Sequence, residues 1–320
     1  MTYRHFLEES NFASRMQDEV LPYLCARREE GKFQTVDGAT LFTVHYRADA
    51  PRGSVVILHG MGESAEKYHE LCYYFLKSNL SVFLFDQRGH GRSTREAHAG
   101  VVHIKDFEVY AQDFTDLIEA KLAELPTPRY LFAHSMGGAV AALYLERGTN
   151  VFDKALLSSP AIAIQIKGTP RALVRLICNA ACAAGRAKER VHVMKPPLPP
   201  QEESHKGSSC ASLARFEAYR AVKLSDKRLH SAKPSYAWLR AAMRATSHIL
   251  RPRQLKRVCT SVRILSAERD HLVDLNAQRA FARAIADGEI FEIAHARHEL
   301  FNECDHISHP YFNDLLDYFA

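Results

Sequence analysis

The sequence predicts an α/β fold with a mostly parallel, doubly wound β-sheet and an inserted helical cap. Short apolar runs alternate with stretches of helical spacing through most of the chain, as in sheets whose strands are buried on both faces and joined by helices. Polar and glycine-rich loops follow these runs, and such loops meet at the carboxyl ends of parallel strands. The alternation stops at about residue 164 and resumes after residue 256, so we interpret this interval as an insertion.

The first half of the chain contains most of the predicted strands. Residues 1–35 predict an irregular or helical lead-in, solvated over residues 18–30, and the alternation of residues 39–47 predicts an early antiparallel strand with one exposed face. Buried parallel strands are then predicted at residues 53–58, 81–85, 130–132 and 154–160, with helices at residues 65–78 and 107–125 and a helix that ends at residue 147.

The second half begins with the predicted cap. It contains helical runs at residues 172–177 and 237–249 and no buried strand, and alternation returns with strands at residues 261–265 and 289–293 and helices at residues 276–286 and 311–319. There is no internal repeat. We therefore assign residues 1–163 and 257–320 to the core and residues 164–256 to the cap.

Composition excludes several classes of protein. The 320 residues are 47% hydrophobic and 25% charged, as expected of one globular domain with an insertion. The net charge of +5 comes without a basic arm or a nucleic-acid-binding motif, so we expect no nucleic-acid partner, and an anionic membrane surface suits the charge better.

Cysteine usage and the N-terminus bear on the compartment. The seven cysteines are scattered and form no C-x-x-C pair, which is typical of free thiols in a reducing compartment. The chain starts without a signal-peptide pattern and has no apolar run near the roughly 20 residues of a membrane span. We expect a cytoplasmic protein, whose charge is compatible with peripheral contact at the inner face of the membrane.

Ser135 is the candidate nucleophile. Residues 130–140 pass from an apolar run through His-Ser-Met-Gly-Gly into a small-residue helical pattern, which predicts a strand, a sharp turn and a helix. Such a turn exposes the serine hydroxyl above the sheet and aims helix N–H groups at a developing oxyanion. Ala133 replaces the first glycine of the usual G-x-S-x-G motif. A serine that only caps a helix gives the same local pattern. Whether Ser135 is a nucleophile or a helix cap therefore depends on the residues of the later loops.

Asp270 is the candidate acid. A serine nucleophile needs a histidine base and a carboxylate that orients it, and in sheets of this type they follow the serine in the order acid, histidine. The loop after residues 261–265 contains Glu268, Asp270 and Asp274. Asp270 is best placed, whereas Asp274 suits the cap of the next helix, and Glu268, nearer the strand end, stays open as an alternative.

His298 is the candidate base. It lies in the loop after the last predicted strand, where Glu299 and Glu303 could anchor that loop. His295 competes with it, although its place at the strand end also suits a half-buried sheet residue. The chain has 17 histidines, so a histidine alone indicates nothing. His298 is the candidate because it completes the order Ser135, Asp270, His298.

The backbone N–H groups of Met61 and Met136 are the expected oxyanion hole. Met136 follows the nucleophile, and Met61 lies in the His-Gly-Met-Gly loop at residues 59–62, where glycine allows close approach of the backbone. Such a loop can also bind phosphate. The chain has neither G-x-G-x-x-G nor a G-K-[ST] ending here, so nucleotide binding is disfavoured.

These segments together resemble the α/β-hydrolase fold, in the serine-hydrolase branch that includes monoacylglycerol lipases and bacterial lysophospholipases. The resemblance extends from about residue 53 to the C-terminus. Ala133 and the long basic cap with Tyr-Ala-Trp-Leu at residues 236–239 are most similar to bacterial inner-membrane lysophospholipases. The matching segments are residues 59–63, 86–93, 134–138, 159–161, 268–270 and 298–299.

The resemblance implies an acyl-enzyme mechanism without a metal or organic cofactor. His298 would activate Ser135, and the N–H groups of Met61 and Met136 would hold the oxyanion. The loop with Asp86, Arg88 and His90 would be mainly structural. The residues expected to support the site are His59, Gly60, Asp86, Arg88, His134 and Gly137.

The expected substrates are single-chain glycerolipids, lysophospholipids first and monoacylglycerols second. A general carboxylesterase or serine aminopeptidase with the same triad is an alternative, because a fold does not determine a substrate. A non-catalytic binding module is a further alternative, against which the intact nucleophile, base and acid argue. The cap helices combine apolar faces with arginines, which fits either a cap core with a solvated rim or an acyl tunnel with a basic mouth.

Overall fold

The structure is a computed structural model that describes residues 3–98, 100–148, 151–165, 168–192 and 194–320. Residues 1–2 of the predicted lead-in and residues 166–167 and 193 of the predicted cap lie outside this part of the chain. The strands in chain order are β1 (Arg28–Gln34), β2 (Thr40–Tyr46), β3 (Gly53–Leu58), β4 (Leu80–Phe85), β5 (Val101–Val102), β6 (Arg129–His134), β7 (Lys154–Ser158), β8 (Lys233–Pro234), β9 (Ser261–Ala267) and β10 (Gly288–Ile293).

The described strands form one eight-stranded sheet in the order β1-β2-β4-β3-β6-β7-β9-β10, with β5 and β8 paired separately. Strands β1, β2 and β4 pair antiparallel, and every pairing from β4 across to β10 is parallel. The predicted fold class is confirmed.

The helices are α1 (Phe12–Arg15), α2 (Leu21–Cys25), α3 (His69–Lys77), α4 (Glu108–Lys121), α5 (Met136–Leu145), α6 (Arg171–Ala183), α7 (Leu213–Ser225), α8 (Tyr236–Ile249), α9 (Pro252–Leu255), α10 (Leu275–Ala284) and α11 (Asp305–Tyr318).

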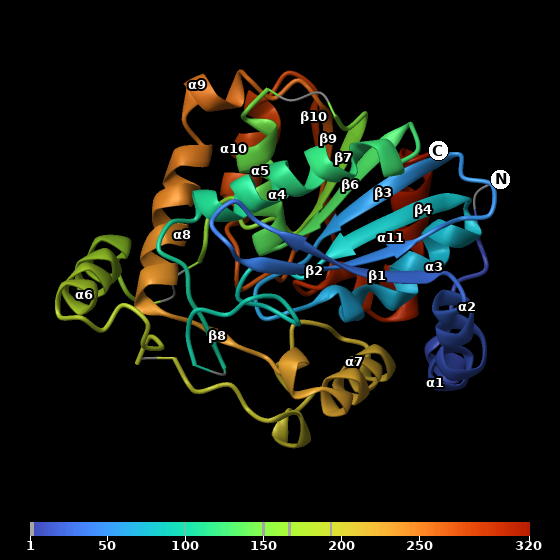
Figure 1. Cartoon of the computed structure of the whole chain (residues 1–320), viewed down its shortest axis with the longest axis horizontal. Helices are drawn as coiled ribbons and strands as arrows, with labels where there is room; N and C mark the ends of the chain where they lie inside the picture. The colour runs from blue at the N-terminus through green and yellow to red at the C-terminus, as the bar shows by residue number, and fades with distance from the viewer. Residues whose placement is uncertain (1–2, 99, 149–150, 166–167, 193) are drawn as a thin grey trace.

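Helices cover both faces of the sheet, with α4, α5 and α10 on one side and α3 and α11 on the other (Figure 1). Strand β3 illustrates why a strand between two helical layers contains a continuous apolar run, here Val55 to Leu58. Val56 and Leu58 enter the core under α4 and α5, while Val55 and Ile57 enter the core under α3 and α11. Since successive side chains of a strand point to opposite faces, the part of a strand that is covered on both faces must be apolar at consecutive positions.

The order of the strands fixes where the loops meet. From β3 the chain first moves to β4 on one side of it and then to β6 on the other. Such a reversal of direction opens a crevice beyond the carboxyl ends of the strands concerned, where sheets of this class bind ligands. The loops after β3 and β6 therefore flank one crevice.

The interval predicted as a cap adds no strand to the large sheet within the residues that the structure describes. It contributes α6 to α9 and the short strand β8, which pairs with β5, a pairing that the sequence did not predict. Helix α8 is fixed to the core, because the Trp238 Nε1–H donates to the Tyr110 hydroxyl of α4 at 3.2 Å. Helix α7 is held by Arg215, whose guanidinium pairs with the Glu70 carboxylate of α3 at 2.9 Å. The boundaries 164–256 stay a prediction.

Two expectations for the N-terminal part were wrong. Residues 28–34 are mostly exposed, but they are not irregular or helical: they form the edge strand β1, which pairs along its whole length with β2. Its Arg-Glu-Glu-Gly-Lys-Phe-Gln sequence carries no apolar alternation, because an edge strand is protected from aggregation by charge. Strand β2 is in turn buried on both faces after its first residue, rather than exposed on one.

Helix α11 begins at Asp305, earlier than the predicted residue 311. Proline removes one backbone hydrogen bond inside a helix, yet α11 accommodates Pro310 in its second turn. All seven cysteines belong to the described residues, and each is a free thiol. None of the described helices combines the length and the apolarity that crossing a membrane requires.

Candidate active site

Ser135 lies at the turn between β6 and α5 in a strained conformation, with φ of 52° and ψ of −117°. This left-handed backbone is rare for a residue other than glycine and must be held by its surroundings. The Ser135 N–H donates to the Ser158 carbonyl at 3.1 Å, and the Ser135 carbonyl accepts from the Ala161 N–H at 2.8 Å. A side chain on Gly137 would place its Cβ 2.3 Å from the Leu58 carbonyl oxygen, so only glycine lets α5 approach β3 this closely.

The structure brings together the three residues predicted as nucleophile, base and acid. The Ser135 Oγ lies 2.8 Å from His298 Nε2, and His298 Nδ1 lies 2.6 Å from Asp270 Oδ2. The other oxygen of Asp270 accepts from the N–H groups of Leu272 and Val273 at 2.8 and 3.2 Å. This arrangement makes Nδ1 the protonated nitrogen of a neutral His298 and leaves Nε2 free to accept the serine proton.

The pKa of Asp270 reflects two opposing influences. Burial of the carboxyl raises it, but the hydrogen bond to His298 and the two backbone donors outweigh burial and hold the pKa of Asp270 below its usual value. The carboxylate is therefore ionised at neutral pH and can stabilise a positive charge on the imidazole.

The competing residues lie elsewhere. Asp274 caps α10, where its side chain accepts from the N–H groups of Asn276 and Ala277. Glu268 is exposed and accepts from the His295 N–H at 2.6 Å. His295 is exposed rather than half-buried, with a side chain that is 70% accessible. None of the three lines the pocket at Ser135.

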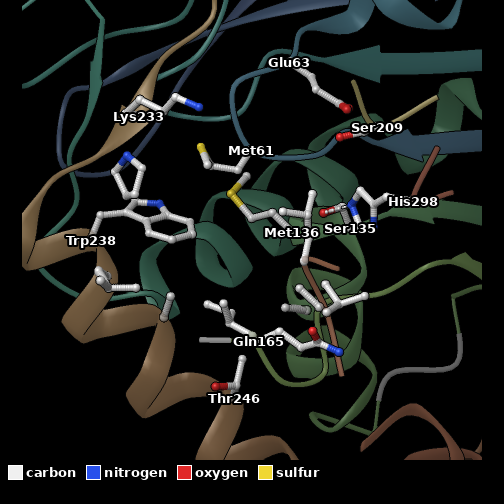
Figure 2. A pocket seen from close by; sticks show the side chains of 18 of the residues that line it. Met61, Glu63, Ser135, Met136, Gln165, Ser209, Lys233, Trp238, Thr246 and His298 are labelled. Atoms are coloured by element: carbon white, nitrogen blue, oxygen red, sulfur yellow. Dashed lines mark hydrogen bonds between the residues drawn. The ribbon is translucent and has the colours of Figure 1, made fainter. Parts of the chain in front are cut away.

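Met61 and Met136 line one pocket together with Ser135, and Figure 2 shows their side chains next to each other. Among the described residues, neither of their backbone N–H groups donates a hydrogen bond. Both donors therefore stand free beside the nucleophile, as an oxyanion hole requires.

His59 connects the loop of Met61 to the loop after β4. Its ring is buried, its Nδ1–H donates to the Gly60 carbonyl at 2.8 Å, and its Nε2 accepts from the Gln87 N–H at the same distance. Burial, as the largest influence, lowers the pKa of His59, so the ring stays neutral. It holds the backbone in place and does not contact Ser135 in the structure.

Asp86 and Arg88 also hold loops. Asp86 is buried and accepts from the N–H groups of Ala65 and Arg92, both at 2.7 Å. Arg88 forms paired hydrogen bonds to Asp113 at 2.8 and 3.0 Å and to Asp37 at 2.7 and 2.8 Å. These contacts fix the loop after β4 from three directions, which agrees with the structural role implied by the resemblance.

His134 lies behind the nucleophile. It is fully buried, its Nδ1–H donates to the Ser158 carbonyl at 3.1 Å, and its ring packs 4.9 Å from that of His298. Burial lowers the pKa of His134 to about 4, so it places an uncharged ring against the candidate base.

A buried lysine joins the two loops that carry the chemistry. Lys67 Nζ lies 2.7 Å from Glu63 Oε1 and 2.8 Å from Glu299 Oε1. Glu63 Oε2 accepts from the Gly60 N–H at 2.8 Å, in the loop of Met61, and Glu299 directly follows His298. Lys67 therefore ties the loop of Met61 to the loop of the candidate base.

The expected anchors of the His298 loop are both present. Glu299 is held by Lys67 and by the Asn302 amide at 2.9 Å, and Glu303 accepts from the Arg297 N–H at 3.0 Å. The sequence reasoning did not identify Lys67. Its spacing of four residues from Glu63, at the start of the predicted helix, was the available signal.

The pocket has a volume of about 300 Å³ and a mainly apolar lining. Figure 2 shows Ser135 beside His298 on one side of the pocket, Trp238 of α8 facing them across it, and Thr246 at its far end. Met61 and Met136 lie between these walls. Within the described part of the chain, no group of three or more His, Cys, Asp or Glu side chains could hold a metal ion.

Comparisons with known proteins agree with this geometry. Lysophospholipase L2 of Escherichia coli strain K12 is 28% identical over 309 residues, which cover 92% of this chain and 88% of that protein. Monoacylglycerol lipase of Mycolicibacterium smegmatis is 35% identical over 137 residues, which cover 42% of this chain and 48% of that protein. A soluble variant of Saccharomyces cerevisiae monoglyceride lipase has the same fold, with a TM-score of 0.72 at 21% identity over 92% of this chain and 95% of that one.

The family described as "Serine aminopeptidase, S33" matches residues 49–305, an interval that contains the loop of Met61, the Ser135 turn, the interval predicted as a cap and the loops of Asp270 and His298. The chain therefore belongs to this family and is a serine ester hydrolase of the α/β-hydrolase fold.

Proposed function

We propose that the chain is a lysophospholipase, which cleaves the acyl ester of single-chain phospholipids through a covalent intermediate on Ser135. The proposal rests on the hydrogen bonds that connect Ser135 to His298 and His298 to Asp270 at the wall of an apolar pocket. The similarity to lysophospholipase L2 extends over nearly the whole of both chains, and it supports the choice of substrate.

The chemistry follows from the contacts at Ser135. His298 Nε2 takes the hydroxyl proton as Oγ attacks the ester carbonyl, and the N–H groups of Met61 and Met136 bind the oxyanion. His298 then protonates the leaving glycerol oxygen, which departs as the acyl-enzyme forms. Water, deprotonated by the same nitrogen, attacks the acyl group, and the fatty acid leaves as the proton returns to Ser135 Oγ. Asp270 stabilises the imidazolium in both steps.

The substrate reaches the protein at a lipid surface in this proposal, through peripheral contact with an anionic membrane. The net charge of +5 supports this location. Three leucine and isoleucine side chains of α6 are also exposed, between 45% and 64%, and exposed apolar side chains on a helix favour contact with lipid.

The direct test compares wild type with Ser135→Ala on lysophosphatidylethanolamine and on a monoacylglycerol of the same chain length. Fatty-acid release from the lysophospholipid should fall at least 10⁵-fold in the variant, with an unchanged circular dichroism spectrum. Release that persists in Ser135→Ala contradicts the proposed nucleophile.

Two outcomes separate the alternatives. Equal or faster cleavage of the monoacylglycerol supports a monoacylglycerol lipase, an activity borne by the relative from M. smegmatis that matches part of the chain. A preference for short acyl chains or aminoacyl substrates supports a general esterase or aminopeptidase. Capture of a fluorophosphonate probe by wild type, and not by Ser135→Ala, excludes a non-catalytic module.

A further inference from the structure

The pocket at Ser135 contains an unpaired cation. Among the described residues that line it, Lys233 is the one lysine or arginine. Its side chain is half-buried, and no described residue forms an ion pair or a hydrogen bond with its amine. Lys67, which contacts two other lining residues of the pocket, is by contrast paired with Glu63 and Glu299. The positive charge of Lys233 is therefore free for a ligand.

The backbone of Lys233 has a fixed place beside the loop of Met61. The Lys233 N–H donates to the Gly100 carbonyl at 2.9 Å, where β8 pairs with β5. A Cβ on Gly62 would lie 3.1 Å from the Ala232 carbonyl oxygen, so the residue before Lys233 packs against the loop of Met61. Lys233 is thereby held near one of the two expected oxyanion donors.

The nucleophile lies between two different ends of this pocket. In Figure 2, Lys233 and Glu63 lie above Ser135. Gln165 and Thr246 lie below it in the same view. A substrate whose ester carbonyl is at Ser135 can therefore extend in two directions, one of which leads to a free amine.

A second cavity continues from the Gln165 end. It has a volume of about 310 Å³ and a mostly apolar lining. The residues that it shares with the pocket at Ser135 are Ile164, Gln165, Met194 and Leu239. An acyl chain has room on this side, because apolar surface extends through both cavities. The alcohol part of the ester then lies on the Lys233 side of Ser135.

The carboxylates at the Lys233 end are engaged by other groups. Glu63 and Glu299 share Lys67, and their remaining oxygens accept hydrogen bonds from the protein. The donors are the Gly60 N–H and the Tyr68 hydroxyl for Glu63, and the Asn302 amide for Glu299. The two carboxylates and the two lysines sum to zero formal charge. This end of the pocket therefore suits a headgroup that is itself zwitterionic, with an anionic part that can reach Lys233.

We propose that Lys233 is a specificity-determining residue that binds the phosphate of a zwitterionic lysophospholipid while the ester carbonyl lies at Ser135. Its amine donates charge-assisted hydrogen bonds to the phosphate oxygens. Glycerol joins the phosphate to the ester oxygen, so one substrate engages both residues at once. The inference rests on the proposed function, because it names the part of the lysophospholipid that the pocket distinguishes.

A neutral glycerol headgroup suits Lys233 less well. A monoacylglycerol displaces water from the amine and supplies no anion in return, and a charge that loses hydration without gaining a partner costs free energy. A site built to bind a polar group therefore rejects the analogue that lacks it. Lys233 thus favours lysophospholipid over monoacylglycerol.

The test measures the headgroup preference, which is the ratio of kcat/KM for octanoyl lysophosphatidylcholine to kcat/KM for monooctanoylglycerol. Both substrates are used as monomers, and active sites are counted with a fluorophosphonate probe. Lys233→Met should lower the headgroup preference roughly tenfold to 100-fold, because a hydrogen bond to a charged group contributes a factor of this size. The loss should lie mainly in KM. Lys233→Gln, a polar second variant for this half-buried position, should have the same effect, and Lys233→Arg should keep the preference within threefold.

Lys206→Met is the matched control. It removes an exposed lysine of the same interval that does not line the pocket, and it should leave the headgroup preference unchanged. An equal fall of the preference in Lys206→Met and Lys233→Met overturns the inference, because net charge alone would then explain the effect. An equal loss of kcat/KM on both substrates in Lys233→Met also overturns it, since Lys233 would then only support the fold of the pocket.

Inhibition of a soluble short-chain ester assay separates this inference from the proposed function. Glycerophosphocholine should inhibit the wild type at least tenfold more strongly than Lys233→Met, and more strongly than inorganic phosphate does. Equal inhibition of the wild type by inorganic phosphate overturns the assignment to a headgroup. If glycerophosphocholine inhibits through Lys233 and lysophospholipid is not cleaved, the proposed function fails and the phosphate site stands. If lysophospholipid is cleaved with a headgroup preference that Lys233→Met does not alter, the phosphate site fails and the function stands.

Discussion

The network of Lys67 and the Lys233 end of the pocket use charged side chains in opposite ways. At the crevice, the side chains of Glu63, Lys67 and Glu299 are paired and only 9%, 4% and 16% exposed. Lys233 is half-buried and has no ion-pair partner among the described residues. A buried charge must be paired to offset its desolvation, whereas a partly exposed one keeps some of its hydration.

The difference indicates a division of tasks. Buried pairs work only at fixed distances, so the network of Lys67 holds the loops of Met61 and His298 in register. An unpaired lysine keeps its charge for a ligand, and its flexible stem needs no fixed geometry. Catalysis requires the first arrangement, and recognition of a charged headgroup requires the second. Substitutions in the network should therefore affect the chemical step, and those of Lys233 should affect the choice of substrate.

After Ser135, the largest effect is expected at Asp270. Asp270→Asn should reduce kcat on a soluble ester about 10⁴-fold, because the amide removes the negative charge and favours the wrong tautomer of the imidazole. The measurement is steady-state kinetics at neutral pH, with the headgroup preference recorded in parallel. The headgroup preference should not change, which would sharpen the contrast between the two regions.

Asp274→Ala is the matched control for Asp270. Asp274 caps α10, so its removal should lower the free energy of unfolding by about 1 kcal/mol and leave kcat unchanged. A large loss of kcat in Asp274→Ala together with a mild effect of Asp270→Asn would mean that Asp274, and not Asp270, is the acid that orients His298.

Lys67→Met tests whether the buried network holds the site. Removing one partner leaves two buried carboxylates without their cation, which should lower the free energy of unfolding by about 3–5 kcal/mol. Misplacement of the loop of Met61 relative to His298 should reduce kcat by up to about 10²-fold. Lys121→Met, which removes a half-exposed partner of Glu124, should cost at most about 1 kcal/mol.

The pH dependence of Lys67→Met has a definite sign. In wild type, burial raises the pKa of Glu63 and of Glu299, but Lys67 and hydrogen bonds outweigh it and hold both pKa values low. Their stabilisation is therefore present above pH of about 4.3 and lost as pH falls further. Without Lys67, burial dominates and raises both pKa values, so acid should stabilise the variant. The gap in Tm between wild type and variant should narrow from pH 8 to pH 5, and a constant gap would contradict this account.

The parallel core was predictable because its central strands contain continuous apolar runs, such as Val55 to Leu58 in β3, and because its loops carry recognisable motifs. Ser135, Asp270 and His298 were found from their order along the chain, which reflects the order of strands at one edge of the sheet. Strand β1 was not predicted, since its position is set by backbone pairing to β2 and by charge at an edge, neither of which gives a periodic signal. Lys67 was missed for a similar reason, because its importance comes from Glu299, which is far away in the sequence.

The smallest effect is expected where Lys233 joins the core. Lys233 is closely followed by Ser235, whose side chain caps α8 by accepting from the Trp238 N–H. If Lys233 keeps one place relative to Ser135, the hydrogen bond from Trp238 to Tyr110 must hold α8 on the core in solution. A double-mutant cycle of Trp238→Phe and Tyr110→Phe should then give a coupling free energy of about 1 kcal/mol in urea unfolding. A coupling of zero would mean that α8 separates from α4, and Lys233 and the crevice would then move independently rather than bind two parts of one substrate.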